Sequence, residues 1–104
     1  MISEEIAKKY GQDYILRQLA EECGELTQAA LKLIRAWKKE TPTPSSKCRD
    51  SLVEEMADVQ LMLDWVRREV LTADERVRIY HTMETKDVRS YERMILKEVV
   101  GDDD

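Results

Sequence analysis

The chain has 104 residues, of which 22 are acidic and 17 basic, and its net charge is −5. This length suits one domain, so we expect a single helical domain over residues 1–104. An acidic surface repels the phosphates of DNA or RNA, which argues against a nucleic-acid polymer as partner, whereas a small phosphorylated ligand can still bind through a cation.

The composition favours helices and a cytoplasmic protein. Phe is absent, and only 3 Gly and 2 Pro interrupt a chain rich in helix-forming residues. A small core without Phe predicts that a partner subunit completes it.

No apolar run approaches the ~20 residues that span a membrane, and no signal peptide is evident over Met1–Tyr10. We expect Cys23 and Cys48 to be free thiols.

The first half of the chain predicts two helices. A short helix is expected over 4–10, with Ser3 as its N-cap and Gly11 as its stop. A long helix follows over 12–39. The segment 41–46 holds both prolines and four hydroxyl residues, and it must interrupt the helix.

The second half predicts two more helices, over 50–71 and 73–97, with Thr72 or Asp74 as the cap of the last one and Glu75 near its start. Residues 98–104 are expected to fray. Two long helices joined by a short loop form an antiparallel hairpin. The predicted fold class is therefore all-α, an antiparallel helical bundle built on this hairpin and completed by oligomerisation.

Acidic residues fall on the apolar face of the second helix. Successive residues advance by about 100° around a helix. Glu22 lies at the edge of the apolar stripe, Glu25 lies one turn further on, and Glu21 lies further out. The stripe itself consists of Ile15, Leu19, Leu26, Ala30, Leu33 and Trp37, so Trp37 is expected to pack in the core.

The third helix repeats this pattern. Glu55 projects between two apolar residues, Asp58 lies one turn on at the border of the face, and Glu54 points away, where we expect solvent. The apolar face consists of Leu52, Met56, Val59, Met62, Leu63, Val66 and Val70.

Two acidic pairs on facing helices suggest a metal site. A buried carboxylate is costly unless it is paired or bound to a metal, and the basic residues of the second helix, Arg17 and Lys32, lie at other angles. Oxygen ligands suit Mg²⁺ or Mn²⁺. The plain alternative is a solvated acidic face. A di-iron bundle needs Glu-x-x-His, but the only histidine, His81, follows Arg78 at that spacing.

The acidic segments also resemble a known family. The segment Glu21–Glu25 (EECGE) and the segment Glu55–Asp58 (EMAD), with their flanks, resemble the E-E-x-x-E and E-x-x-D motifs of the MazG-like nucleotide pyrophosphohydrolases, within the all-α NTP pyrophosphatase group. The resemblance covers about Tyr14 to Arg67. One departure is the spacing, because 29 residues separate the two segments, slightly more than is usual in the family. The proline-containing loop accommodates the extra length.

The resemblance implies a reaction and a site. It implies Mg²⁺-dependent hydrolysis of ribo- or deoxyribonucleoside triphosphates to the monophosphate and pyrophosphate, in a homodimer or homotetramer. Mn²⁺ is a possible substitute for Mg²⁺. Glu21 would support a metal ligand or orient the attacking water. The implied metal ligands, which with Glu21 form the catalytic set, are Glu22, Glu25, Glu55 and Asp58.

Further residues are candidates for binding the substrate. Lys86 and Arg89 share one face of the fourth helix, where the family usually carries basic residues, although a solvated basic stripe is an equal alternative. Lys47 and Arg49 on the loop are weaker candidates for the phosphates. Gln18 lies one turn before Glu22 and is a candidate contact for the sugar or base. Trp65 would stack on a nucleobase or, as we favour, pack against another subunit.

Two other functions fit the same features. Phosphoribosyl-ATP pyrophosphohydrolase resembles this family in its fold and acidic motif, and comparing substrates would separate the two. A non-catalytic helical module for oligomerisation or regulation, whose acids bind structural Mg²⁺ or nothing, is the alternative outside the enzymes.

Overall fold

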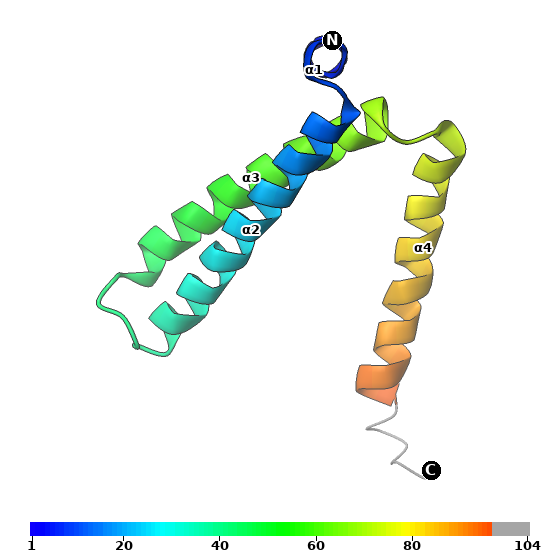
Figure 1. Ribbon diagram of the computed structural model, residues 1–104. Coiled ribbons are helices and arrows are strands. Elements are labelled where there is room, and N and C mark those ends of the chain that lie inside the picture. The colour runs from blue at the N-terminus through cyan, green and yellow to red at the C-terminus, as the bar shows by residue number, and fades with distance from the viewer. Residues whose placement is uncertain (97–104) are drawn as a thin grey trace. The chain divides into compact units, whose positions relative to one another are not determined.

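The computed structural model describes residues 1–96, which are helical apart from short connections (Figure 1). The helices are α1 (Ile2–Tyr10), α2 (Gln12–Trp37), α3 (Ser45–Glu69), α4 (Ala73–Tyr91) and the π-helical turn η1 (Glu92–Leu96). Within this range there is no strand, which confirms the all-α class, and no helix combines the length and apolarity that crossing a membrane requires. The predicted tail, 98–104, lies outside the described residues.

The chain forms two compact units, one from Met1 to Val70 and one that begins at Leu71. The first unit consists of α1, α2 and α3. Helices α2 and α3 run antiparallel and pack along their lengths as the predicted hairpin, and α1 packs against both of them (Figure 1). The buried apolar side chains of this unit are Ile15, Ala29, Leu33, Cys48, Val59, Met62 and Val66.

The junction of α1 and α2 differs in one respect from its prediction. Gly11 separates the two helices as expected, and its φ of 92° is a left-handed conformation that glycine tolerates. Ser3 is not the N-cap, which is Met1. Ser3 is instead buried inside α1, and its hydroxyl donates a hydrogen bond of 2.8 Å to Glu69 Oε2. Gln12 Nε2 donates to the Glu69 carbonyl at 2.7 Å, so both helices are tied to the end of α3.

The loop end of the hairpin also departs from the sequence pattern. Helix α3 begins at Ser45, directly after Pro44, five residues earlier than expected. Lys47 and Arg49, which were expected on the loop, therefore lie in α3. Cys48 is buried in the same helix, and both cysteines are free. Trp37 is not in the core, because α2 ends at this residue and its side chain is 58% exposed. The Arg49 guanidinium lies 5.9 Å from the centre of its ring.

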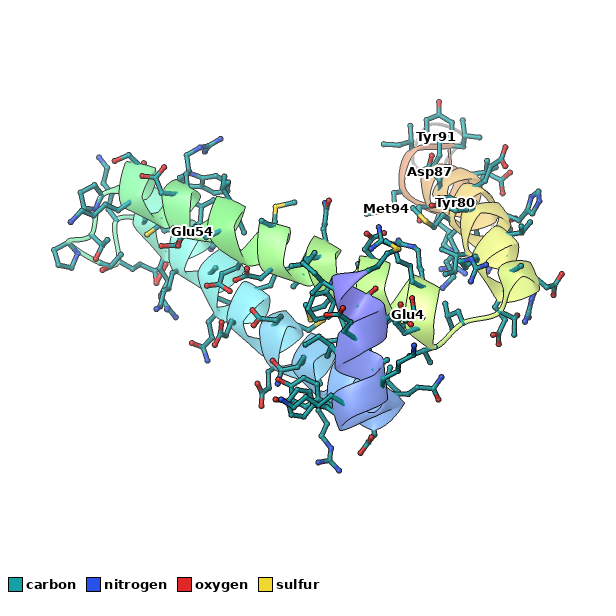
Figure 2. The ribbon with its side chains drawn as sticks, turned by 90° about the horizontal axis from the view of Figure 1, so that it is seen from above. Glu4, Glu54, Tyr80, Asp87, Tyr91 and Met94 are labelled. Atoms are coloured by element: carbon teal, nitrogen blue, oxygen red, sulfur yellow. The ribbon has the colours of Figure 1, made fainter. Side chains whose placement is uncertain are left out.

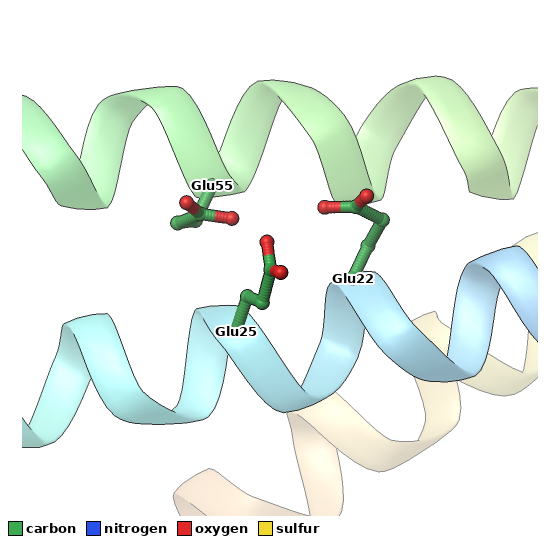
Figure 3. Close-up of side chains that lie close together, drawn as sticks. All are labelled: Glu22, Glu25 and Glu55. Carbon is green, nitrogen blue, oxygen red and sulfur yellow. The ribbon is translucent and has the colours of Figure 1, made fainter.

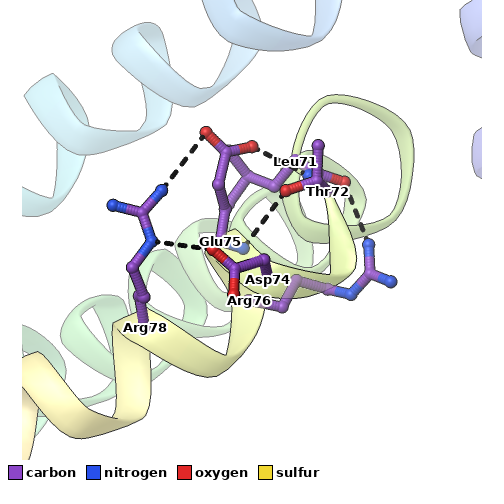
Figure 4. A network of polar contacts seen from close by, with 6 residues as sticks. All are labelled: Leu71, Thr72, Asp74, Glu75, Arg76 and Arg78. Atoms are coloured by element: carbon purple, nitrogen blue, oxygen red, sulfur yellow. Dashed lines mark hydrogen bonds and ion pairs between the residues drawn. The ribbon is translucent and has the colours of Figure 1, made fainter.

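The second unit begins with a well-formed helix cap (Figure 4). Thr72 Oγ1 accepts a hydrogen bond of 3.2 Å from the Glu75 N–H, and Glu75 Oε1 accepts one of 2.9 Å from the Thr72 N–H. This capping box confirms Thr72 as the cap. The backbone hydrogen bond from Thr72 is the main cause that lowers the pKa of Glu75. Arg78 adds an ion pair to Asp74 at 3.3 Å.

Candidate metal centre

Three glutamates meet between the two helices of the hairpin (Figure 3). Glu22 and Glu25 come from α2, and Glu55 comes from α3. Each offers one carboxylate oxygen, and these three oxygens all lie within 4.8 Å of one another. Glu22 and Glu55 are half-buried, whereas Glu25 is exposed. The cluster therefore has a covered side, toward the hairpin interior, and an open side.

Helical spacing explains why these side chains converge. Glu22 and Glu25 are three residues apart, so they lie on neighbouring turns of one side of α2. Glu22 is seven residues from each of the buried Ile15 and Ala29, so it lies on nearly the same side of α2 as they do. Glu55 lies one turn before the buried Val59. Packing of the apolar faces against each other therefore brings the acids of both helices together.

Two of the carboxylate oxygens lack a hydrogen-bond donor. Glu22 Oε2 and Glu55 Oε2 are buried, and neither accepts a hydrogen bond within the part of the chain that the structure describes. Buried polar atoms in folded proteins almost always have a partner. A carboxylate oxygen accepts protons or binds cations, so these two atoms fit a positive ligand.

The electrostatics of the cluster lead to the same conclusion. Burial is the main cause that raises the pKa of Glu22, and the charges of Glu25, Asp58 and Glu21 add to it. Burial likewise raises the pKa of Glu55 first, followed by the charge of Glu25 and a side-chain hydrogen bond with Glu25, and then by the charges of Asp58 and Glu22. Five acids thus repel one another around a partly covered space, and a divalent cation would relieve that repulsion.

The other predicted residues of the hairpin lie around this cluster. Asp58 and Glu21 are exposed. They are not among the three acids whose oxygens converge, but each is near enough to raise the pKa of Glu22. Gln18 is half-buried, one turn before Glu22 on α2. Trp65 is half-buried, about two turns after Asp58 on α3.

The predicted basic residues of the fourth helix belong to the second unit. Lys86 and Arg89 are both exposed, and they line one hollow along α4 together with His81, Thr82 and Thr85. They therefore share a face of α4, as their spacing predicts. Their role in binding phosphates stays a prediction.

A basic cavity, which the sequence did not predict, lies at the loop end of the hairpin. This cavity has a volume of 360 Å³, and its charged lining residues are Lys32, Arg35 and Lys47. Threonines of the loop and residues of both helices complete its wall, namely Ala29, Thr41, Thr43, Cys48 and Ser51. Its residues come from three segments, so no single stretch of sequence reveals it. The sequence offered two signals, namely Lys47 as a candidate for the phosphates and the spacing of seven residues that places Glu25 and Lys32 on one side of α2.

Comparison of the chain with protein-family models, with curated proteins and with solved structures found no match.

Proposed function

We propose that this protein is a Mg²⁺-dependent nucleoside triphosphate pyrophosphohydrolase, which cleaves between the α- and β-phosphates to release a nucleoside monophosphate and pyrophosphate. The observation that carries the proposal is the convergence of one carboxylate oxygen each from Glu22, Glu25 and Glu55 to within 4.8 Å of one another. Two oxygens of the cluster, Glu22 Oε2 and Glu55 Oε2, are also buried and have no hydrogen-bond partner within residues 1–96. The resemblance of the two acidic segments to the MazG-like motifs supplies the reaction class.

The donor set fits a hard divalent cation. Glu22, Glu25 and Glu55 would hold Mg²⁺ through carboxylate oxygens, and Asp58 would complete the set. When bound, the ion would neutralise charge on the phosphate oxygens and favour ionisation of a water. Glu21 is exposed beside Glu22, and we assign it to orienting the attacking water.

Exposed apolar side chains support oligomerisation as part of the same proposal. On α2 and α3, Leu31, Val53 and Leu61 are each about half exposed or more. On α4, Tyr80 and Tyr91 are also exposed, and Figure 2 labels both. Exposed apolar side chains of this kind are what a second copy would cover. A homodimer or homotetramer would thereby complete the helical bundle.

Product analysis tests the proposed reaction. The protein is incubated with Mg²⁺ and a panel of ribo- and deoxyribonucleoside triphosphates, and the products are separated by chromatography. We expect monophosphate and pyrophosphate, abolished by EDTA and lowered at least about tenfold by Glu55→Gln. Glu54→Gln is the matched control, because Glu54 is the neighbouring acid on α3 and is exposed (Figure 2).

Other products would contradict the proposal. Diphosphate and orthophosphate would mean that the bond cleaved is a different one. Turnover of phosphoribosyl-ATP alone would assign the alternative substrate. No turnover of any of these compounds would favour a non-catalytic helical module.

A further inference from the structure

The lining of the basic cavity has no acid to balance its charge. Its charged residues are the three cations Lys32, Arg35 and Lys47. Within residues 1–96, no ion pair joins any of them to a carboxylate, whereas Lys8, Arg17, Arg68 and Arg78 each have an acidic partner. Three such side chains at one cavity offer charged hydrogen-bond donors to an anion with several oxygens.

Backbone and hydroxyl donors lie at the same end of the hairpin. Helix α3 is 25 residues long and begins at Ser45, next to the cavity-lining Thr43 and Lys47. Its first turn contains no acidic residue, and no side chain caps it. The N-terminus of a long helix favours negative charge, so it adds to the attraction that the three cations create.

The basic cavity adjoins the acidic cluster along both helices. Ala29, in its wall, lies one turn after Glu25 on α2, and Ser51, also in its wall, lies one turn before Glu55 on α3. One turn of helix corresponds to about 5.4 Å. Because α2 and α3 are antiparallel, these two steps lead in the same direction, toward the loop. A ligand that contacts the acids through a cation can therefore extend into the cavity.

We propose that the basic cavity binds the two terminal phosphates of the substrate, the part that leaves as pyrophosphate. Ligand pockets for whole drug-sized molecules span roughly 300–1,000 Å³. At 360 Å³ this cavity has room for a pyrophosphate group. The assignment of this group as part of a substrate rests on the proposed function, whereas binding of the anion itself does not.

The cavity would then stabilise the leaving group. In the proposed reaction, the oxygen of water bonds to the α-phosphorus, and the bond from that phosphorus to the α–β bridging oxygen breaks. The bridging oxygen departs with the electron pair as part of pyrophosphate, and the proton of the water passes to a carboxylate or to solvent. Lys32, Arg35 and Lys47 would bind the charge that this step transfers to the departing group.

Calorimetric titration with inorganic pyrophosphate tests the cavity directly. The full chain is titrated in EDTA, which removes any divalent cation. The acidic cluster would then repel pyrophosphate. We expect pyrophosphate to bind, and each of Lys32→Ala and Lys47→Ala to weaken its affinity about tenfold, as loss of a charged hydrogen bond should. Lys38→Ala is the matched control, because Lys38 is exposed at the same end of the hairpin but does not line the cavity, and it should bind as the wild type does.

The same variants separate this inference from the proposed function. Failure of pyrophosphate to bind, or equal weakening by all three substitutions, would overturn the cavity assignment. If triphosphates are hydrolysed but both KM and kcat are unchanged in Lys32→Ala and Lys47→Ala, the cavity assignment fails and the reaction stands. If pyrophosphate binds as expected but no triphosphate is hydrolysed, the reaction fails and the cavity stands as an anion site.

Discussion

At the scale of single residues, two buried carboxylate oxygens make the acidic cluster a candidate site for a cation. Glu22 and Glu55 each have one oxygen that is buried without a hydrogen-bond partner within residues 1–96. Burial and the neighbouring acids raise the pKa of both groups. Without a cation, the ionised cluster therefore opposes folding, and the two predictions for single residues follow from this repulsion.

Replacing one of the buried acids should stabilise the metal-free protein. We expect Glu22→Leu to raise the melting temperature in EDTA by a few degrees, because the substitution removes a buried charge and adds apolar contact. Glu21→Leu is the control, since Glu21 is exposed, and it should change the melting temperature less. In excess Mg²⁺ the gain should shrink or reverse, because the wild type gains stability from the ion. A melt in EDTA in which Glu22→Leu is the less stable protein would contradict this account.

The raised pKa values also predict a pH dependence. A carboxyl group whose pKa is higher in the folded state favours folding when protonated. Its contribution is fully present below its unfolded pKa of about 4.5 and is lost as pH rises through the folded value. In EDTA, lowering the pH from neutrality to about 4.5 should therefore stabilise the protein. Glu4 and Glu75, whose pKa values are lowered, act in the opposite direction only at lower pH.

Glu55→Gln provides the comparison for this pH dependence. The amide does not titrate, so the melting temperature of the variant should change less than that of the wild type over the same interval. Equal slopes for the two proteins would show that the cluster does not cause the trend.

For single elements, periodicity was enough to predict the hairpin but not its ends. The apolar stripes over 12–39 and 50–71 predicted two long helices, because a core face must repeat every 3.6 residues. Helix ends depend instead on local caps and on contacts with the facing helix. Helix α3 begins at Ser45 because the chain is free to turn helical directly after Pro44, and Cys48 then packs against α2. Trp37 continues the stripe in projection but lies at the last residue of α2.

The packing of the hairpin gives a direct prediction for stability. Ile15 on α2 is fully buried, with 0% of its surface exposed. We expect Ile15→Ala to lower the free energy of unfolding by about 3 kcal/mol, through lost apolar burial and the cavity left behind. The adjacent Leu16 is 44% exposed, so Leu16→Ala is the matched control and should cost about 1 kcal/mol or less. Urea denaturation of the two variants tests this, and equal losses would contradict the described packing.

For the whole molecule, the sequence could predict the class of fold and the acids that meet. Acids on or beside apolar faces predicted a cluster of Glu22, Glu25, Glu55 and Asp58, and the oxygens of the first three converge. It could not identify the basic cavity, since Lys47 joins Lys32 and Arg35 only when α2, the loop and α3 assemble. The sequence also could not show which apolar side chains are buried within a single copy of the chain. Apolar periodicity predicts which side of a helix faces its neighbour. The exposed fraction of each side chain also depends on where the neighbouring helix ends.

The central claim is that the acidic cluster binds a divalent cation, and Mn²⁺ binding followed by electron paramagnetic resonance tests it most directly. Free Mn²⁺ gives a sharp signal that falls on binding, so titration yields an affinity without requiring turnover. We predict binding by the wild type and by Glu54→Gln, weakened at least about tenfold in Glu55→Gln. Competition by Mg²⁺ should release the bound Mn²⁺. Absence of binding, or equal binding by Glu55→Gln and the wild type, would contradict a metal centre at this cluster.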